Sequence, residues 1–330
     1  MLEHGGQLRS AAAHHGIPLA DWLDLSTGIN PNGWPVPPLP AAIWQRLPED
    51  DDGLEAAAAA YYGNPDCLAV AGSQAAIQCL PTLLPRAAVA CLAPLYNEHP
   101  LAWQRAGHRV RLLQNTTLQR TLRATTPYVL LCNPNNPTAH RHSREELLDA
   151  AKQLGQRGGT LIVDEAFIDA TPEDSLTALA GSNEFPNLIV LRSLGKFFGL
   201  AGTRIGFVFA GSGLCARMRD SMGPWTVSGP ARAVARLALL DTDWQLAGRI
   251  RLRAAGERLR TLLEPLGEVT ATPLFATLSH PQAHALYEHL ARAAILTRRF
   301  PDSPLLRVGL PGDESGWQRL AAAVAAWSPK

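Results

Sequence analysis

The feature that most constrains the fold is a repeated alternation of short, largely apolar runs and helical segments between residues 67 and 210. Strands of four or five residues are predicted at Cys67–Ala71, Ala88–Leu92, Arg109–Leu113, Tyr128–Cys132, Thr160–Val163, Leu188–Leu191 and Gly206–Ala210. Helices are predicted between them at Ala75–Leu84, Glu98–Ala106 and Ser143–Gln156. Apolar strands alternating with helices favour an α/β fold, with a mainly parallel sheet covered by helices on both faces.

The pattern changes after Gly211. Helices are predicted at Gly213–Ser221, Pro230–Leu240, Trp244–Leu263, Pro281–Ala293 and Asp313–Trp327, and strands at Val269–Leu278 and Leu305–Leu310. A chain of 330 residues with 46% hydrophobic content is long enough for two lobes. We therefore expect a large domain over residues 26–212 and a smaller α+β domain built from residues 1–25 and 213–330.

Composition narrows the class of protein. The net charge of +1 carries no electrostatic signature of nucleic acid or anionic membrane as a partner. Five cysteines, an odd number without a C-x-x-C pair, are typical of buried thiols in a reducing compartment. The N-terminus lacks the apolar stretch of a signal peptide, and no window is apolar enough to span a bilayer. We expect a cytoplasmic protein.

Polar residues that could bind a ligand or take part in a reaction follow several of the predicted strands. They are Gly72 and Ser73, Tyr96, Asn136, Asp164 and the turn Ser193–Lys196. In an open α/β sheet the ligand crevice lies at the carboxyl ends of the strands, so we expect these residues to gather at one edge.

The turn after Leu191 presents a lysine in apolar surroundings. Lys196 lies next to Gly195 and Phe197, with Ser193 three residues before it and Arg204 eight residues after it. A desolvated amine can attack a carbonyl and form a Schiff base with pyridoxal phosphate, while the serine and the arginine bind a phosphate. The alternative is a strand-end lysine that extends to water.

The other residues at this edge have ordinary alternatives. Asp164 can pair with a protonated ring nitrogen, or be a capping or ion-paired aspartate. Asn136, between two prolines, can bond to a ring hydroxyl or form a plain turn. Ser73 opens a helix whose N-terminus suits a phosphate, and Tyr96 can stack on a ring or pack in a loop.

Arginines in the C-terminal part can bind a carboxylate. Arg307 alternates with apolar neighbours on a predicted strand and suits a bidentate contact, or else lies in solvent on an edge strand. Arg298 and Arg299 offer similar capacity, and the sequence does not decide which of them points inward. The histidine pairs at 14–15 and 140–142 have no ligand partner at matching spacing, so no metal site is expected.

With these residues in place, the chain resembles the fold-type-I pyridoxal-phosphate enzymes of the aminotransferase superfamily over nearly its whole length. The resemblance rests on the segments GSQAAI, PLY, NPNNPT, DEAF, SLGKFFGLAGTRIG and LLRVGL. It implies that Lys196 forms the internal aldimine and that Asp164 pairs with the pyridine nitrogen. It also implies a homodimer with sites at the subunit interface.

The resemblance assigns further roles to residues that match the family's motifs. Cofactor binding is implied for Ser73, Gln74, Tyr96, Asn136, Asp164, Ser193, Lys196 and Arg204. Substrate binding is expected of His4, Gly28, Asn136, Arg298 and Arg307, with Arg307 as the clamp for the substrate carboxylate.

Within the superfamily the chain is similar to the threonine-phosphate decarboxylases of cobalamin biosynthesis, which are near relatives of the histidinol-phosphate aminotransferases. The residues that carry this likeness are His4–Gly6, Asp24–Pro31, Asp164–Asp169, Leu191–Leu194 and Met222–Trp225. The likeness implies decarboxylation of L-threonine O-3-phosphate to (R)-1-amino-2-propanol O-2-phosphate and CO₂.

Two positions depart from the family pattern, and the reaction stays open. Leu47 stands where relatives often have a tyrosine that reaches the neighbouring subunit's cofactor phosphate, and Ala139 replaces the glycine usual after Pro137-Thr138. An aminotransferase acting on a phosphorylated amine would use the same residues around the cofactor. A regulator without catalysis would lack the lysine or add a DNA-binding segment, and neither is seen.

Overall fold

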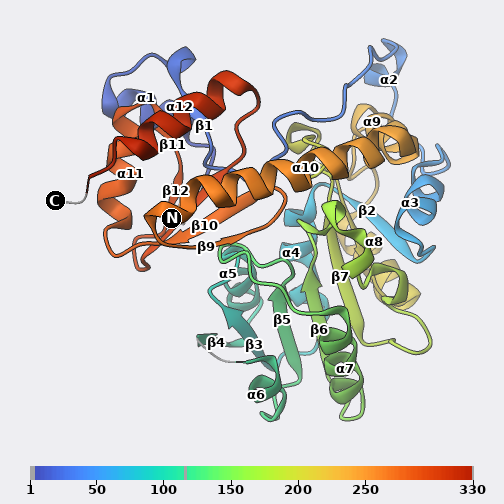
Figure 1. Cartoon of the computed structure of the whole chain (residues 1–330). Helices are drawn as coiled ribbons and strands as arrows, with labels where there is room; N and C mark the ends of the chain where they lie inside the picture. Colours follow the sequence, from blue (N-terminus) through green and yellow to red (C-terminus); the bar gives the residue numbers. More distant parts are fainter. Residues whose placement is uncertain (1–3, 115–116, 329–330) are drawn as a thin grey trace. The chain divides into compact units, whose positions relative to one another are not determined.

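The computed structural model describes residues 4–114 and 117–328. By contacts the chain separates into two compact units. The large unit consists of Trp34–Asn136 and Arg141–Leu246, and the small unit consists of Met1–Gly33, Pro137–His140 and Ala247–Lys330. Both are seen in Figure 1. The predicted domain division, with the large domain over residues 26–212, stays a prediction.

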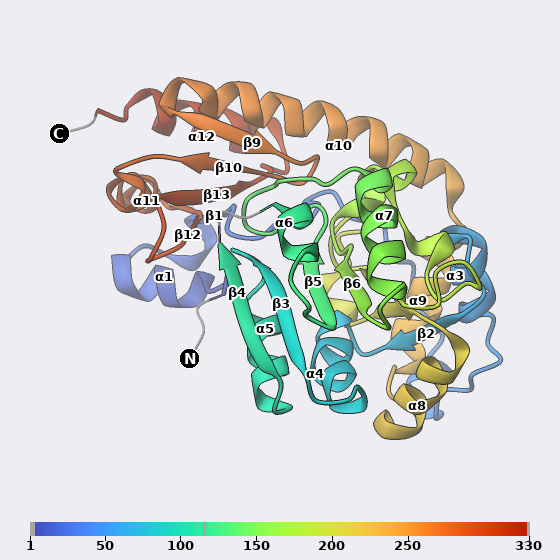
Figure 2. The same cartoon turned by 90° about the horizontal axis from the view of Figure 1, so that it is seen from below.

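The large unit is built on a seven-stranded sheet in the order β2-β8-β7-β6-β5-β3-β4 (Figures 1 and 2). Its strands are β2 (Cys67–Val70), β3 (Ala88–Ala93), β4 (Arg109–Gln114), β5 (Tyr128–Cys132), β6 (Thr160–Asp164), β7 (Leu188–Ser193) and β8 (Gly206–Phe209). Neighbours from β4 to β7 pair in parallel, whereas β8 is antiparallel to both β7 and β2. The predicted α/β fold with a mainly parallel sheet is confirmed.

Helices cover both faces of this sheet. The long ones are α3 (Leu54–Tyr62), α4 (Ser73–Leu83), α5 (Glu98–Arg105), α7 (Arg144–Gly155), α8 (Ser212–Met222) and α9 (Gly229–Leu240). Shorter ones are α2 (Ala42–Gln45) and α6 (Leu118–Leu122). The predicted capping box at the start of α7 is present, because Ser143 and Glu146 each bond to the other's backbone N–H.

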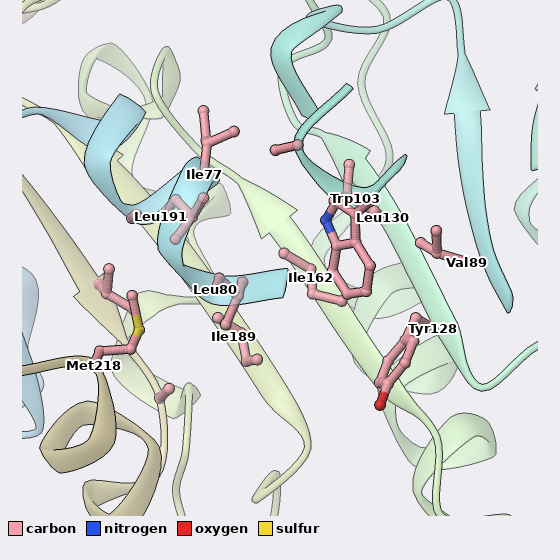
Figure 3. Close-up of a cluster of buried hydrophobic side chains, with 14 of the residues drawn as sticks. Ile77, Leu80, Val89, Trp103, Tyr128, Leu130, Ile162, Ile189, Leu191 and Met218 are labelled. Atoms are coloured by element: carbon pink, nitrogen blue, oxygen red, sulfur yellow. The ribbon is translucent and has the colours of Figure 1, made fainter. Parts of the chain in front are cut away.

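One buried cluster fills the space between the sheet and helices α4, α5 and α8 (Figure 3). Alternate residues of the central strands, such as Leu130 and Ile162, contribute to it together with Leu80 and Trp103 from the helices. Because side chains alternate across a strand, the residue two positions after Ile162 faces the same way. That residue is Asp164, so the helices on this face also determine its surroundings.

The small unit combines the N-terminal segment with the C-terminal part of the chain. Its helices are α1 (Leu8–His15), α11 (Ala283–Arg292) and α12 (Glu314–Ala325), and α10 (Thr242–Leu263) begins in the large unit and ends here. An antiparallel sheet has the order β12-β13-β10-β9, with β12 at Arg298–Arg299, β13 at Leu305–Gly309, β10 at Phe275–Ser279 and β9 at Glu268–Ala271. Strands β1 (Leu23–Asp24) and β11 (Ile295–Leu296) pair in parallel beside it.

The prediction of one strand over Val269–Leu278 was wrong. The segment forms two antiparallel strands, β9 and β10, joined by a turn at Thr272–Leu274. Pro273 cannot donate to a ladder, and the hydroxyl of Thr272 accepts from the backbone N–H groups of Leu274 and Phe275. The proline therefore interrupts the strand, and the threonine hydroxyl stabilises the turn.

No helix among residues 4–114 and 117–328 combines the length and the apolarity needed to cross a membrane.

The cluster of Figure 3 makes a direct prediction about stability. Leu130 is fully buried in the central strand β5, so Leu130→Ala should lower the free energy of unfolding by about 2–5 kcal/mol. Leu112, on the edge strand β4, is 51% exposed, and Leu112→Ala should change it by less than about 0.5 kcal/mol. Urea denaturation followed by fluorescence compares the two, and equal losses would contradict this location of the core.

Candidate active site

The residues expected at the carboxyl edge of the large sheet are found there. Asp164 ends β6, Ser193 ends β7, and Asn136 follows β5 by four residues. Ser73 is the first residue of α4, and Tyr96 lies between β3 and α5. Several of these residues are also close to one another, as the contacts below show.

The carboxylate of Asp164 is buried and paired with a histidine. Only 5% of Asp164 is exposed, and its Oδ2 lies 2.8 Å from Nε2 of His99, which is itself 1% exposed. Its Oδ1 accepts from the backbone N–H of Ala166 at 3.0 Å. Helix α5 supplies His99 because it covers the face of the sheet towards which Asp164 points. The aspartate is thus held in one orientation, with a polarising partner behind it.

Cys132 lies at the centre of this group. It pairs in register with Asp164 across β5 and β6, and the backbones of Tyr96 and Asn136 lie near enough to its thiol to oppose the rise of its pKa. Burial raises the pKa of this thiol well above its usual value, and the charge of Asp164 raises it further. Tyr96, Asn136 and Asp164 therefore surround one buried, neutral thiol.

The ring of Tyr96 is fixed from two sides. It meets the His99 ring edge-to-face with centroids 6.1 Å apart, and its hydroxyl donates to Oε1 of Gln74 at 3.4 Å. The Gln74 amide in turn donates to Glu98 at 2.9 Å. Burial, with Glu98 and Asp164, raises the pKa of Tyr96 to about 12. A neutral aromatic face is thus presented next to the aspartate, and Gln74 supports it.

An anion seat lies at the start of α4. Gly72 has φ +73°, and a Cβ there would lie 2.7 Å from Nη2 of Arg204, so only glycine allows the guanidinium to approach this closely. A Cβ on Gly206 would likewise lie 2.7 Å from the backbone nitrogen of Ser73. A guanidinium beside the first N–H groups of an 11-residue helix is an arrangement that binds a phosphate. Ser193, at the end of β7, turns its hydroxyl towards the backbone N–H of Gly195 at 3.3 Å.

Lys196 lies in the turn that follows β7. It is half-buried, and its Nζ lies 5.3 Å from the ring centroid of Phe167, three residues after Asp164. Both neighbours in the sequence, Gly195 and Phe197, are buried. The amine therefore lies against an aromatic ring from another segment of the chain, and it does not extend fully into water.

A buried charge cluster joins the ends of β6 and β7 on the opposite face of the sheet. Arg192 is 1% exposed and donates to Glu165 at 2.9 Å and to Asp169 at 2.5 Å. Glu165 also accepts from the hydroxyls of Ser175 and Thr177. Burial alone would lower the pKa of Arg192, but Asp169, Tyr62 and Glu165 raise it overall. Because Glu165 follows Asp164 and Arg192 precedes Ser193, this cluster fixes the two strand ends relative to each other.

The small unit holds a buried arginine of its own. Arg307 on β13 is 7% exposed, its Nη2 donates to the carbonyl of Ser26 at 2.8 Å, and its guanidinium lies 5.3 Å from the Phe275 ring centroid. Burial lowers the pKa of Arg307 to about 10, and Arg298, its partner in the β12–β13 register, adds to this. The alternative of a solvated edge-strand arginine was wrong, because β13 is an inner strand that pairs with β12 on one edge and with β10 on the other.

A cleft of about 230 Å³ lies beside these residues within the small unit. It is lined by His4, Gly5, Gly6, Ser26, Thr297, Arg298, Arg299 and neighbouring residues of α1 and α11. Arg299 lies over the Tyr287 ring and donates to His284. The charge of Arg298 instead lowers the pKa of Arg307. The predicted substrate residues His4 and Arg298 thus share one cleft, and the predicted Gly28 is buried two residues after Ser26.

One group of side chains resembles a metal site in composition. His99, Cys132 and Asp164 offer ligand atoms within 4.8 Å of one another. His99 already bonds to the aspartate at 2.8 Å, so the same three side chains also form a hydrogen-bonded pair beside a buried thiol.

Sequence reasoning missed His99 and the role of Arg192. The available signal for His99 was its position three residues after Tyr96 at the start of a helix, which places both on one face. For Arg192 it was a charge inside an otherwise apolar strand, which must have a buried partner. The partners Glu165 and Asp169 are more than twenty residues away, so only the fold could identify them.

These contacts define an edge that fits a flat ring bearing a phosphate. A buried carboxylate, a fixed aromatic face, an anion seat and an amine lie along the same edge of the sheet. The family model for aminotransferase class I and II matches residues 46–324. The chain belongs to this family.

The chain is also similar to individual proteins of known name. The chain is 50% identical to a threonine-phosphate decarboxylase of Pseudomonas aeruginosa over 326 residues, which cover 98% of this chain and 97% of that protein. Among solved structures it is similar to a histidinol-phosphate aminotransferase from Sinorhizobium meliloti in complex with pyridoxal-5'-phosphate, with a TM-score of 0.80, 22% identity and coverage of 98% and 94%. The L-threonine-O-3-phosphate decarboxylase from Porphyromonas gingivalis gives 0.74, 21%, 91% and 98%. At these identities the two structures confirm the fold alone.

The Arg192 cluster predicts a large effect on stability. Arg192→Met leaves Glu165 and Asp169 buried without their cation and should lower the free energy of unfolding by about 3–5 kcal/mol. Arg258 forms an exposed pair with Glu314, and Arg258→Met should lower it by no more than about 1 kcal/mol. Thermal and urea denaturation of both variants measures the difference. A loss below about 1 kcal/mol for Arg192→Met would contradict the account of a buried charge cluster.

Proposed function

We propose that the chain is a pyridoxal-phosphate-dependent decarboxylase that converts L-threonine O-3-phosphate to (R)-1-amino-2-propanol O-2-phosphate and CO₂. The observation that carries the proposal is the 50% identity to a threonine-phosphate decarboxylase over nearly the full length of both chains. The place in cobalamin biosynthesis that the resemblance implies belongs to the same proposal. The contacts at the sheet edge support it independently, because they fit the cofactor group by group.

The large unit supplies the proposed cofactor site. Arg204, the N–H groups at Ser73 and the hydroxyl of Ser193 would hold the phosphate, and Tyr96 would stack on the ring. The Asn136 amide would bond to the ring hydroxyl. Gln74, which bonds to both Tyr96 and Glu98, would act by supporting the stacked ring.

The charge of Asp164 would determine how well a bound cofactor accepts electrons. When bound, the cofactor supplies a conjugated ring that accepts electrons from the bond being broken. The buried Asp164 would hold a proton on the ring nitrogen, because a carboxylate in a low-dielectric site strongly favours a neighbouring cation. His99, whose Nε2 lies 2.8 Å from Oδ2, would keep that carboxylate aimed at the ring.

Lys196 has two proposed tasks. It would carry the cofactor covalently until the amino group of the substrate replaces it, and its freed amine would then hold a proton near the substrate Cα. The aromatic wall at Phe167 limits the positions that this amine can take. Its half-buried position excludes part of the bulk water that would otherwise solvate the ammonium.

The small unit supplies groups for the anionic ends of the substrate. Arg307 would bind the carboxylate bidentately, since its guanidinium is buried and oriented by the Ser26 carbonyl. His4 and Arg298, which line one cleft with Gly5 and Gly6, would bind the substrate phosphate. Gly28 and Asn136 complete the proposed substrate contacts. A decarboxylase must hold the scissile carboxylate perpendicular to the ring, so the Arg307 contact has to permit that orientation.

A homodimer is part of the proposal. Large apolar side chains are exposed on two segments. Before α3, Trp44 is 67% and Leu47 62% exposed, and after α8, Trp225 is 59% exposed. Exposed apolar residues of this size favour a protein–protein contact. Leu47 cannot make the polar contact that a tyrosine makes at this position in relatives, so its contribution to a dimer would be apolar. We also place the protein in the cytoplasm, where its five free cysteines would stay reduced.

The competing function is that of an aminotransferase acting on a phosphorylated amine, which a curated relative named histidinol-phosphate aminotransferase, 30% identical over 328 residues, keeps open. Both reactions would use Lys196 and Asp164. They differ only in which bond at Cα stands perpendicular to the ring. Products therefore decide between them.

The decisive experiment supplies L-threonine O-3-phosphate to the purified, cofactor-loaded protein and measures CO₂ release and the amine product. We expect gas evolution in step with formation of the phosphorylated aminopropanol. Conversion of the cofactor to its pyridoxamine form without CO₂ would instead identify an aminotransferase. Lys196→Ala should lose activity. It should also lose the link between cofactor and lysine, which borohydride reduction makes permanent and mass spectrometry detects in the unchanged protein. If activity survived in this variant, the lysine assignment would be wrong.

The His99–Asp164 contact predicts a graded loss. His99→Ala removes a hydrogen bond to a charged group, which is worth about 1.5–3 kcal/mol and should lower kcat/KM about 10- to 100-fold. His99→Gln keeps a donor and should recover part of it. The position of the visible absorbance band of the bound cofactor should shift in the alanine variant. Unchanged kinetics and spectrum in His99→Ala would separate the histidine from the cofactor site.

A further inference from the structure

One part of the large unit has a charge unlike that of the chain as a whole. Residues 85–127 contain six arginines and a single acidic residue, although the whole chain has a net charge of only +1. All six arginine side chains are exposed. They are Arg86, Arg105, Arg109, Arg111, Arg120 and Arg123. We call this group the arginine surface.

These arginines are not neutralised by the protein. Within residues 4–114 and 117–328, none of the six forms a salt bridge. The one acidic residue of the segment, Glu98, is bonded to Gln74 and Gln78. Other arginines of the chain are paired, such as Arg232 with Asp52 and Arg258 with Glu314. The arginine surface therefore keeps its full positive charge for an external anion.

Topology separates this surface from the proposed active site. Arg86 lies just before β3, Arg105 just before β4, and Arg123 at the end of α6, before β5. Residues that precede parallel strands lie at their amino ends, whereas Asp164 and Ser193 lie at the carboxyl ends. A partner bound to the arginine surface would thus leave the catalytic edge open.

The arginine surface includes an unpaired strand edge. β4 is the outermost strand of the sheet, as Figures 1 and 2 show, and among the described residues only β3 pairs with it. The N–H of Arg109 points to β3, where it bonds to Ala87. Because successive residues alternate in direction, the backbone groups of Val110 and Leu112 point outward. The side chain of Leu112 is 51% exposed beside them.

A hollow adjoins this strand on the side of α6. It has a volume of about 310 Å³ and is lined by Ala87, Ala88, Arg109, Arg111, Thr125, Thr126 and Pro127. Both guanidinium groups of β4 therefore flank a space that can receive side chains. A side chain in the hollow meets positive charge and hydroxyl groups. The outward backbone groups of Val110 and Leu112 belong to the same strand, outside the hollow.

We propose that the arginine surface is a docking site for an extended acidic segment of another protein, which adds as a strand to β4. Main-chain bonds to Val110 and Leu112 would supply affinity, and carboxylates facing Arg109 and Arg111 would supply specificity. Charged residues on an edge also protect it from aggregation, but that role explains only the two arginines within β4. Nucleic acid matches the charge and makes no use of the outward backbone groups.

The test uses the full-length, cofactor-loaded protein and a fluorescein-labelled peptide of alternating glutamate and valine. Fluorescence anisotropy should show binding at low salt that weakens as salt is added. Arg109→Glu combined with Arg111→Glu should weaken it at least about tenfold, without loss of decarboxylase activity. Hydrogen exchange should show new protection of the Val110 and Leu112 amides when the peptide binds. Arg120→Glu with Arg123→Glu, outside the strand, tests the same surface if the first variant fails to fold.

Arg217→Glu with Arg292→Glu changes the charge equally at exposed positions on α8 and α11, and should leave peptide binding intact. Three results would overturn the proposal. They are no peptide binding at low salt, an equal loss in this control pair, and no protection of the Val110 and Leu112 amides. In the last case, displacement of the peptide by a single-stranded oligonucleotide would identify a site for polyanions in general.

Discussion

The large unit depends on one costly group, the carboxylate of Asp164 buried at the end of a central strand. A buried carboxylate is tolerated only with a partner, and His99 at 2.8 Å supplies it. The helix that carries His99 packs on the same face of the sheet through Trp103, and Tyr96 precedes His99 by three residues. Pairing the aspartate therefore fixes the helix, and the helix fixes the ring of Tyr96.

The parallel arrangement makes this edge precise in a second way. Asp164 and Glu165 are consecutive, so they face opposite sides of the sheet. The first is held by His99 and the second by Arg192, which immediately precedes Ser193. One strand end is thus tied to the next by a buried ion pair on one face, and Asp164 and Ser193 face the other side. The ion pair contributes position more than stability, since its gain is largely offset by desolvation.

The two ends of the same sheet differ in charge as well as in position. At the carboxyl ends Asp164 and Arg204 are satisfied inside the protein or face a phosphate seat. At the amino ends, the arginine surface forms no salt bridge with any residue of 4–114 or 117–328. Much of this was predictable from sequence: the strand–helix alternation, the gathering of Asn136 and Ser193 at one edge, and the capping of α7. The turn at Pro273 was not, because a proline in an apolar run is compatible with either an edge strand or a break.

By itself the sequence determined the fold class and the lysine, aspartate and arginine candidates, because these follow from local periodicity and residue chemistry. Only the tertiary structure identified His99 as the partner of Asp164, Glu165 and Asp169 as the partners of Arg192, and the inner position of Arg307. The physical reason is that a buried charge requires a partner but does not specify where along the chain that partner lies. Which distant segments pack together decides it.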